Sequence, residues 1–421
     1  KDWGKDNLWE IKDSPQIFRE PIMPPEEAFA PRLLVACPKA EWADVARAFL
    51  ERAGGPASLP TKGVPPRALF DQVRQTIRLE DVSIDDLPDG PALPAAVLVR
   101  GYGNDVERAL LLAALLRGAG QKADVVLARH RGNGPMLDSA ARLRGLTEAV
   151  IRLTAPDGKE TWLGADSEDR AFGELDPDVQ GSEGLDLATG KLIAVPVLPP
   201  AAEAKHRTVE VDLAPDGTAT VTDSHKLTGH FALEYRRLKN MTQEELQNWA
   251  IRFVSGEATG VDLLEFTHSD LGNANAEERM AFKYRVPALG DKAGDFLVVS
   301  LPNARVTAVD VGRSTREYGL FWSGGEREEA TFVVRAPAGY AAYAVGQKVE
   351  KRGEGWSLVA EFAAEPSTSL GAGPSAKGAV RFHETWERSA LTAPKDAYAA
   401  YREARIARSR LRGEVIVFVK E

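Results

Sequence analysis

Between residues 38 and 120, apolar side chains recur every three or four positions, which is the period of an amphipathic helix. The pattern predicts helices within residues 39–55, 65–81 and 105–120. The last of these segments is apolar on nearly all sides, so we expect it to form a buried central helix. Residues 1–37 show no such period and are rich in proline, and we expect them to be the tail of a domain that begins upstream.

Short apolar runs follow the helices. They predict strands within residues 122–130, 146–164 and 192–198. Helices followed by antiparallel strands are typical of the α+β class, and we place this first domain at residues 38–198.

Residues 199–206 are predicted to be a linker, and after them the hydrophobic period changes to two. This alternation predicts a β-sandwich-like domain over residues 207–421. Thr242 and Glu245 have the spacing of a capping box and mark the start of an inserted helix. The predicted elements are a hairpin at residues 207–229, the inserted helix at 242–256, strands at 281–289, 296–301, 327–337, 356–365 and 378–391, a hairpin loop at 367–378, a helix at 394–412 and a final strand at 413–420.

Composition narrows the classes of function. A chain of 421 residues suggests two or three domains. The formal net charge of -9 argues against sequence-independent binding of nucleic acid, which depends on excess lysine and arginine. With Cys37 as the single cysteine, neither an intrachain disulfide nor a cysteine-based metal site can form. No apolar run reaches about 18 residues, so no transmembrane helix is expected, and no cofactor or metal is predicted.

Three short motifs carry a resemblance to a known family. Residues 100–120 read RGYGNDVERALLLAALLRGAG, a glycine-rich turn followed by the buried helix. Residues 65–170 resemble the bacterial transglutaminase-like domain, a branch of the papain-like fold, in the architecture that places it between two β-rich domains. In that family the helix reads G-x-C-x-[DE]-x-A-x-L-L-x-x-L-L-R-x-x-G, and Asp105 stands at the cysteine position. The second motif, H-x-[VW]-[VI]-x-[VL], matches EAVIRL with Glu148 for histidine, and the third, W-[LV]-D-P-T, matches the start of WLGADSE with Gly164 for aspartate.

The resemblance implies the fold and argues against the family's activity. In the family a cysteine thiolate at the helix N-terminus attacks the amide, a histidine carries the proton and an aspartate orients the histidine. Asp105, Glu148 and Gly164 stand at those three positions, so this degenerate triad is predicted to have no catalytic residue. A carboxylate cannot replace a thiolate in acyl transfer from an amide.

Asp105 and Glu148 leave a further question open. On the family scaffold the two positions face each other across a cleft, so the carboxyl groups must share a proton, bind Ca²⁺ or Mg²⁺, or be separated by water. In the alternative interpretation, Asp105 caps its helix while Glu148 faces solvent or pairs with an arginine such as Arg108.

Other candidate residues have simpler interpretations. We expect Cys37 to be a small buried residue and His130 to lie in a surface loop. His225 and His230 could share a hairpin face, but no further metal ligand is evident beside them. The arginines of the helix at 394–412 are interpreted as a solvated face. Tyr318, Phe321 and Trp322 form either a contact site or core packing beneath the sandwich.

These observations favour a catalytically inactive transglutaminase-like scaffold. By the family resemblance it would be a protein-binding or structural component of the bacterial cell envelope, in the periplasm or at the cell surface, with a protein or peptide partner. One alternative is a hydrolase or acyltransferase that uses Asp105 and Glu148 as acid and base. A second alternative is a carbohydrate-binding β-sandwich, which would need exposed, coplanar tryptophan or tyrosine side chains.

Overall fold

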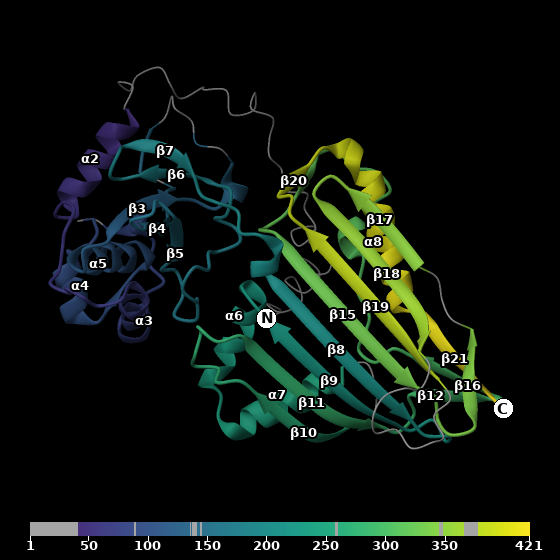
Figure 1. Ribbon diagram of the computed structural model, residues 1–421. Coiled ribbons are helices and arrows are strands. Elements are labelled where there is room, and N and C mark those ends of the chain that lie inside the picture. Colours follow the sequence, from purple (N-terminus) through teal and green to yellow (C-terminus); the bar gives the residue numbers. More distant parts are fainter. Residues whose placement is uncertain are drawn as a thin grey trace, which may run out of the picture.

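A computed structural model describes residues 41–421 except 88–89, 135, 137–140, 144, 257–259, 345–347 and 366–377. The expected N-terminal tail, Cys37 and nearly all of the hairpin loop predicted at 367–378 lie outside the described residues. The described chain is mixed α+β and has several sheets. Figure 1 shows a helix-rich N-terminal region, residues 41–198, beside a larger β-rich C-terminal region, residues 199–421.

The N-terminal region combines four helices with a five-stranded antiparallel sheet of order β5-β4-β3-β6-β7, and α3 and α4 pack on α5. The helices are α2 (Trp42–Arg52), α3 (Pro66–Thr76), α4 (Pro94–Arg100) and α5 (Asp105–Gly118), and the strands are β3 (Lys122–Ala128), β4 (Glu148–Thr154), β5 (Glu160–Gly164), β6 (Glu183–Asp186) and β7 (Lys191–Ala194). Helix α5 lies on β3 and β4 and is buried without interruption from Val106 to Leu116, as its all-round apolar sequence predicts.

Two element boundaries near the junction of the two regions differ from the predictions. The strand expected at 192–198 ends at Ala194, because Pro196 has no N–H group for continued pairing. Strand β8 begins at Ala204, inside the stretch expected to be a linker, because Ala204 already pairs in register with Arg327 of the neighbouring strand.

The C-terminal region is built on an eight-stranded sheet of order β10-β11-β9-β8-β15-β19-β18-β17. Its strands are β8 (Ala204–Leu213), β9 (Ala219–Leu227), β10 (Asp262–His268), β11 (Glu278–Val286), β15 (Glu326–Arg335), β17 (Lys348–Gly353), β18 (Trp356–Glu365) and β19 (Ala379–Arg388). The pair β8–β15 is parallel, whereas the other neighbours are antiparallel. Alternate residues of β8, β9 and β19 are buried, so one face of this sheet meets the core and the other is polar and faces outward.

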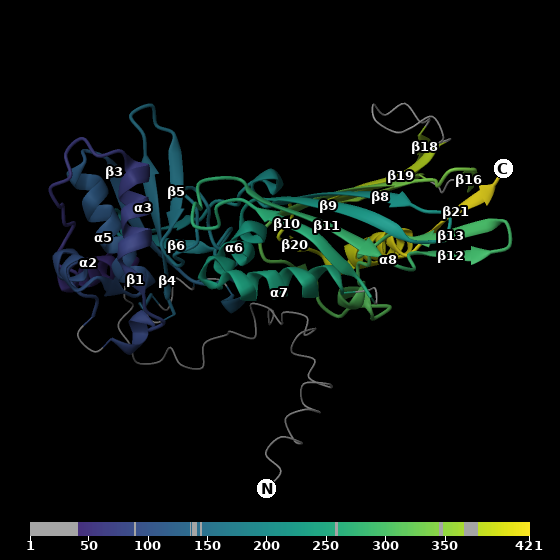
Figure 2. The same ribbon diagram turned by 90° about the horizontal axis from the view of Figure 1, so that it is seen from below.

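A second layer covers the buried face of the large sheet. It consists of a four-stranded sheet of order β12-β13-β21-β16 with a helix at each side. Helix α7 lies against β10 and β11 (Figure 2), and α8 contacts β17 and β18. The elements are α6 (His230–Arg236), α7 (Gln243–Val254), α8 (Tyr398–Arg412), β12 (Gly290–Ala293), β13 (Phe296–Ser300), β16 (Tyr340–Ala344) and β21 (Val415–Lys420). Side chains of both sheets and both helices form one hydrophobic core, so the sandwich has a mixed second layer.

The prediction that the arginines of α8 form a solvated face is wrong for the inner side of this helix. Arg408 and Arg412 are buried and bond to Glu384, which is itself buried on β19. Their spacing of four residues places both on the side of α8 that packs on the sheet.

The aromatic side chains of the C-terminal region offer no flat exposed platform. Trp322 packs against Tyr401 with ring centroids 5.0 Å apart, which agrees with core packing. Among the described residues of this region, the exposed aromatic side chains Phe296 and Tyr343 stand nearly perpendicular to each other. The carbohydrate-binding alternative therefore gains no support. No helix in the described part of the chain is long and apolar enough to cross a membrane.

Candidate functional site

The N-terminus of α5 is capped by Asn104. The Asn104 side chain accepts a hydrogen bond from the backbone N–H of Glu107 at 2.9 Å, and the Glu107 carboxylate accepts one from the Asn104 N–H at 3.2 Å. This is a complete capping box. The interpretation of Asp105 as the helix cap is therefore wrong, and the Asp105 side chain faces other groups.

Asp105 lies against the first residues of β4. Its Oδ2 accepts a hydrogen bond from the Ala149 N–H at 3.1 Å. Burial of the carboxyl group, then the charge of Glu148 and to a lesser degree that of Asp166, raise the pKa of Asp105 to about 8. The structure thus brings Asp105 and Glu148 together, and Asp105 is mainly protonated at neutral pH.

Glu148 pairs with a histidine, where the sequence suggested an arginine or solvent. His130 Nε2 lies 3.3 Å from Glu148 Oε1, and the two side chains are 46% and 21% exposed. The hydrogen bond to Glu148 is the main cause that raises the pKa of His130 to about 9. His130 was predicted to lie in a surface loop, and it is half-exposed, but it is also part of the polar cluster around Asp105.

Gly164 has no room for the aspartate of the family motif. A Cβ atom at Gly164 would lie 2.6 Å from Asp166 Oδ1 and 2.8 Å from Arg170 Cδ. Asp166 is held there by Arg170, whose Nε donates to Asp166 Oδ1 at 2.7 Å. Asp166, two residues after Gly164, thus supplies the third carboxyl group of the cluster, after Asp105 and Glu148. Asp166 is present in the sequence WLGAD, but matching the motif residue by residue assigned its aspartate position to Gly164.

We expect Gly164→Asp to destabilise the protein by about 1–3 kcal/mol, because the new side chain must displace Asp166 and the buried Arg170 that it pairs with. Urea unfolding at pH 7 measures the loss. Gly132→Asp is the matched control, since a Cβ at Gly132 meets nothing within 4 Å, and its effect should be near zero. Equal effects at the two glycines would contradict the steric account.

A buried arginine lies next to the carboxylates. Arg108 is on the first turns of α5 and is 1% exposed. Its Nε and Nη1 atoms have no hydrogen-bond partner among the described residues. Burial lowers the pKa of Arg108, and the charges of Glu168, Asp166 and Asp105 oppose that shift. Arg108 thus supplies positive charge close to the acidic cluster without pairing with Glu148.

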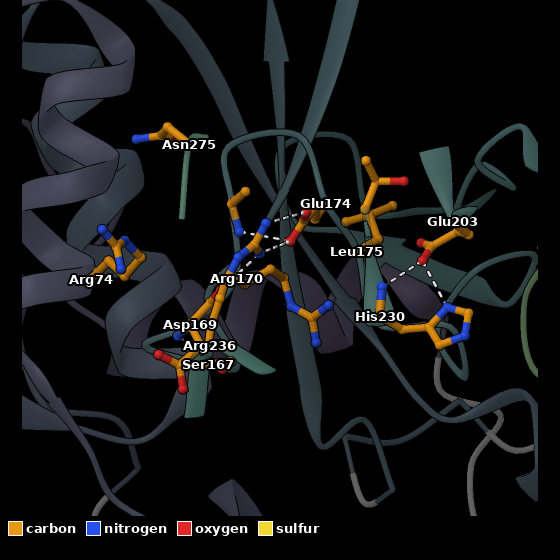
Figure 3. A network of polar contacts seen from close by, with 12 residues as sticks. Arg74, Ser167, Asp169, Arg170, Glu174, Leu175, Glu203, His230, Arg236 and Asn275 are labelled. Carbon is orange, nitrogen blue, oxygen red and sulfur yellow. Dashed lines mark hydrogen bonds and ion pairs between the residues drawn. The ribbon is translucent and has the colours of Figure 1, made fainter. Parts of the chain in front are cut away.

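The same loop that carries Asp166 also joins the two regions. Arg236 of α6 donates to Glu174 Oε2 at 2.9 Å and to the Asp169 carbonyl at 3.0 Å (Figure 3). Lys239 pairs with the Asp169 carboxylate. Arg236 is buried. These links come from residues more than 60 positions apart, so local sequence patterns carried no signal for them.

His225 and His230 do not share a site. His225 Nε2 lies 2.9 Å from buried Asp223, whereas His230 Nδ1 lies 2.8 Å from buried Glu203 (Figure 3). Within the described ranges, no group of three or more histidine, cysteine, aspartate or glutamate side chains is placed to hold a metal ion.

The arrangement around Asp105 can hold and exchange protons. It combines a protonated carboxyl group on Asp105 with Glu148 and a cationic His130. The described residues include no cysteine, and a carboxyl group stands where the family has its thiol. Among the described residues, the cluster therefore has a proton donor and a proton acceptor but no strong nucleophile.

Comparison with known proteins finds a solved structure of similar fold but does not assign the chain to a family. No family model and no curated protein matches the chain. A crystal structure of a "putative protease" from Parabacteroides distasonis is similar, with a TM-score of 0.50 and 14% sequence identity over 90% of this chain and 55% of that chain. This chain thus spans about half the length of that neighbour. At this identity the likeness shows a shared fold and nothing about activity.

Proposed function

We propose that this protein is a catalytically inactive transglutaminase-like scaffold that binds a protein or peptide. The proposal is carried by the state of Asp105. Its carboxyl group is largely protonated and stands at the N-terminus of α5, where an active relative needs a thiolate. As a member of that class, the protein acts in the bacterial cell envelope, in the periplasm or at the cell surface.

The polar cluster supports binding better than acyl transfer. A protonated carboxyl group is a weak nucleophile, and His130 is engaged with Glu148 and makes no hydrogen bond to Asp105 within the described structure. The half-exposed Glu148 and His130 instead present an acceptor and a donor to an extended segment. Backbone N–H and C=O groups of a peptide are the natural partners of such a pair.

The raised pKa of Asp105 favours one second candidate, a hydrolase. In that reaction Glu148 takes a proton from water while the water oxygen attacks the amide carbon, and Asp105 gives its proton to the departing nitrogen. The weakness of this candidate is that Glu148 Oε1 is already paired with cationic His130, so this oxygen is not free to take a proton from water.

The first experiment measures peptidase and transamidase activity on mixed peptides for the native protein, Asp105→Ala and Glu148→Ala. We expect all three to match a buffer blank. Native activity that disappears in both alanine variants would overturn the scaffold and establish carboxylate chemistry. The variant Asp105→Cys/Glu148→His, with Asp166 left in place, serves as the positive design control because it restores a thiol and an imidazole.

Binding is tested separately by selecting peptides from a random library on immobilised protein. We expect Glu148→Arg to lose the selected peptides. Glu210→Arg, an equal charge change on the outward face of β8, should retain them. Equal retention by both variants would show that the cluster around Asp105 is not the binding site.

A further inference from the structure

A separate pocket of about 210 Å³ is lined in part by Arg129 and Arg131, the two neighbours of His130 in the sequence. Its walls come from the segment after β3 and the segment leading into β6. The lining includes Arg129, Arg131, Gly134, Gly181, Ser182 and Glu183. His130 is in extended backbone between the two arginines, so its side chain points to Glu148 while theirs line the pocket.

The lining contains several hydrogen-bond donors that have no acceptor as partner. Nε of Arg129, Nε and Nη1 of Arg131 and Oγ of Ser182 are buried and have no partner among the described residues. Ser182 is only 4% exposed, so bulk water does not compensate its hydroxyl group. Buried donors are almost always paired in folded proteins, and a concentration of unpaired ones in one pocket indicates a missing acceptor.

Both arginines are already positioned by other contacts. Arg129 Nη2 donates to the Asn133 carbonyl and Arg131 Nη2 to the Trp322 carbonyl. The Arg131 guanidinium also lies 4.5 Å from the ring centroid of Phe321. A ligand would therefore meet guanidinium groups held in place, and little side-chain entropy would be lost on binding.

The charge of the lining selects the kind of acceptor. Arg129 and Arg131 contribute two positive charges and the Glu183 carboxylate one negative charge, which leaves one positive charge for a monoanion to neutralise. Burial is the first cause that lowers the pKa of both Arg129 and Arg131; the charge of Arg142 adds to the shift of Arg129, and the charge of Asp178 opposes that of Arg131. Glu183 repels a dianion more than a monoanion, so a carboxylate fits better than phosphate.

We propose that this pocket binds a carboxylate group, through the guanidinium groups of Arg129 and Arg131 and the hydroxyl group of Ser182. Planar carboxylates match the forked donors of arginine, and the volume is far above the roughly 10–15 Å³ that one water needs. The site is distinct from the cluster around Asp105 and does not depend on the function proposed for that cluster.

Calorimetric titration at constant ionic strength tests the site with four probes. They are acetate, N-acetyl-Ala-Ala with a free carboxyl group, the C-terminal amide of the same dipeptide, and inorganic phosphate. We expect acetate to bind saturably and the amide not to bind. Tighter binding of the free dipeptide than of acetate would identify a peptide C-terminus as the ligand, and equal binding would identify a small free acid. Phosphate that binds more tightly than acetate would overturn the carboxylate assignment.

Ser182→Ala is the decisive variant. Its hydroxyl group makes no hydrogen bond within the described structure. Without ligand, the variant and the native protein should therefore have the same midpoint of urea unfolding. Acetate should nevertheless bind about tenfold more weakly. Arg129→Gln should weaken binding by at least as much, and Arg252→Gln, the same change at an exposed site on α7, should leave it unchanged. Native acetate affinity in both Ser182→Ala and Arg129→Gln would refute the proposal.

Discussion

Replacing Asp105 with asparagine is expected to stabilise the protein by about 2–5 kcal/mol at pH 8 and to change nothing at pH 4. In the unfolded chain an aspartate releases its proton near pH 3.9, at about its ordinary pKa. In the folded protein burial and Glu148 raise the pKa of Asp105 to about 8. Between these two values the folded state binds more protons than the unfolded state, so the native protein loses stability as the pH rises.

Asparagine removes this loss because it is neutral at every pH in the window. Its carbonyl oxygen can still accept the hydrogen bond from the Ala149 N–H, so the contact with β4 is kept. The upper end of the expected stabilisation corresponds to the full difference between the pKa of Asp105 in the unfolded chain and in the folded protein. The lower end allows for the part of Asp105 that solvent reaches, since the residue is only half-buried by accessible surface.

Urea unfolding of the native protein and of Asp105→Asn at several pH values from 4 to 9 gives the measurement. The difference in free energy of unfolding should grow from pH 4 to about pH 8 and then level off. Asp262→Asn, at an exposed position of β10, is the control and should show no such trend. A difference between native and Asp105→Asn that stays constant across the range would refute the buried, protonated state.

Local sequence patterns were enough for the elements with strong periodicity. Helices α2, α3, α5 and α7 were predicted because their apolar residues repeat at helical spacing, and α7 also has its capping box. Strand β10 was missed because most of its residues are exposed at the edge of the sheet and show no alternation. The parallel pairing of β8 with β15 was equally hidden, since more than 100 residues separate the two strands.

The candidate site was only partly accessible to sequence reasoning. The motif resemblance placed Asp105 opposite Glu148, and the structure brings these residues together. It gave no indication that His130 would pair with Glu148 or that Asp166 would take the space beside Gly164. Both contacts depend on side-chain directions after folding, which the spacing of residues along the chain does not determine.

A charged residue at an inward-facing position of a strand predicts a buried ion pair, and the sequence contained such a residue. Glu384 has the same parity on β19 as Phe382 and Trp386, so the period of two already placed its carboxylate in the core. A carboxylate at such a position requires a buried cation nearby. Arg408 and Arg412 of α8 supply this positive charge, so the inner side of that helix had to be buried and not solvated.

Glu384→Ala is therefore expected to destabilise the protein by about 3–5 kcal/mol, because it leaves buried guanidinium groups without their carboxylate. Arg408 Nε and Arg412 Nη2 donate to Glu384 at 2.8 and 2.9 Å, and all three side chains are almost fully buried. Urea unfolding at pH 7 measures the loss against Glu387→Ala, a change on the outward face of the same strand that should cost less than about 1 kcal/mol. Arg408 retains a bond to Glu328, so the structural damage should concentrate at Arg412 and the C-terminal turn of α8. A loss below about 1 kcal/mol for Glu384→Ala would mean that α8 is held to the sheet by its apolar side chains and not by these ion pairs.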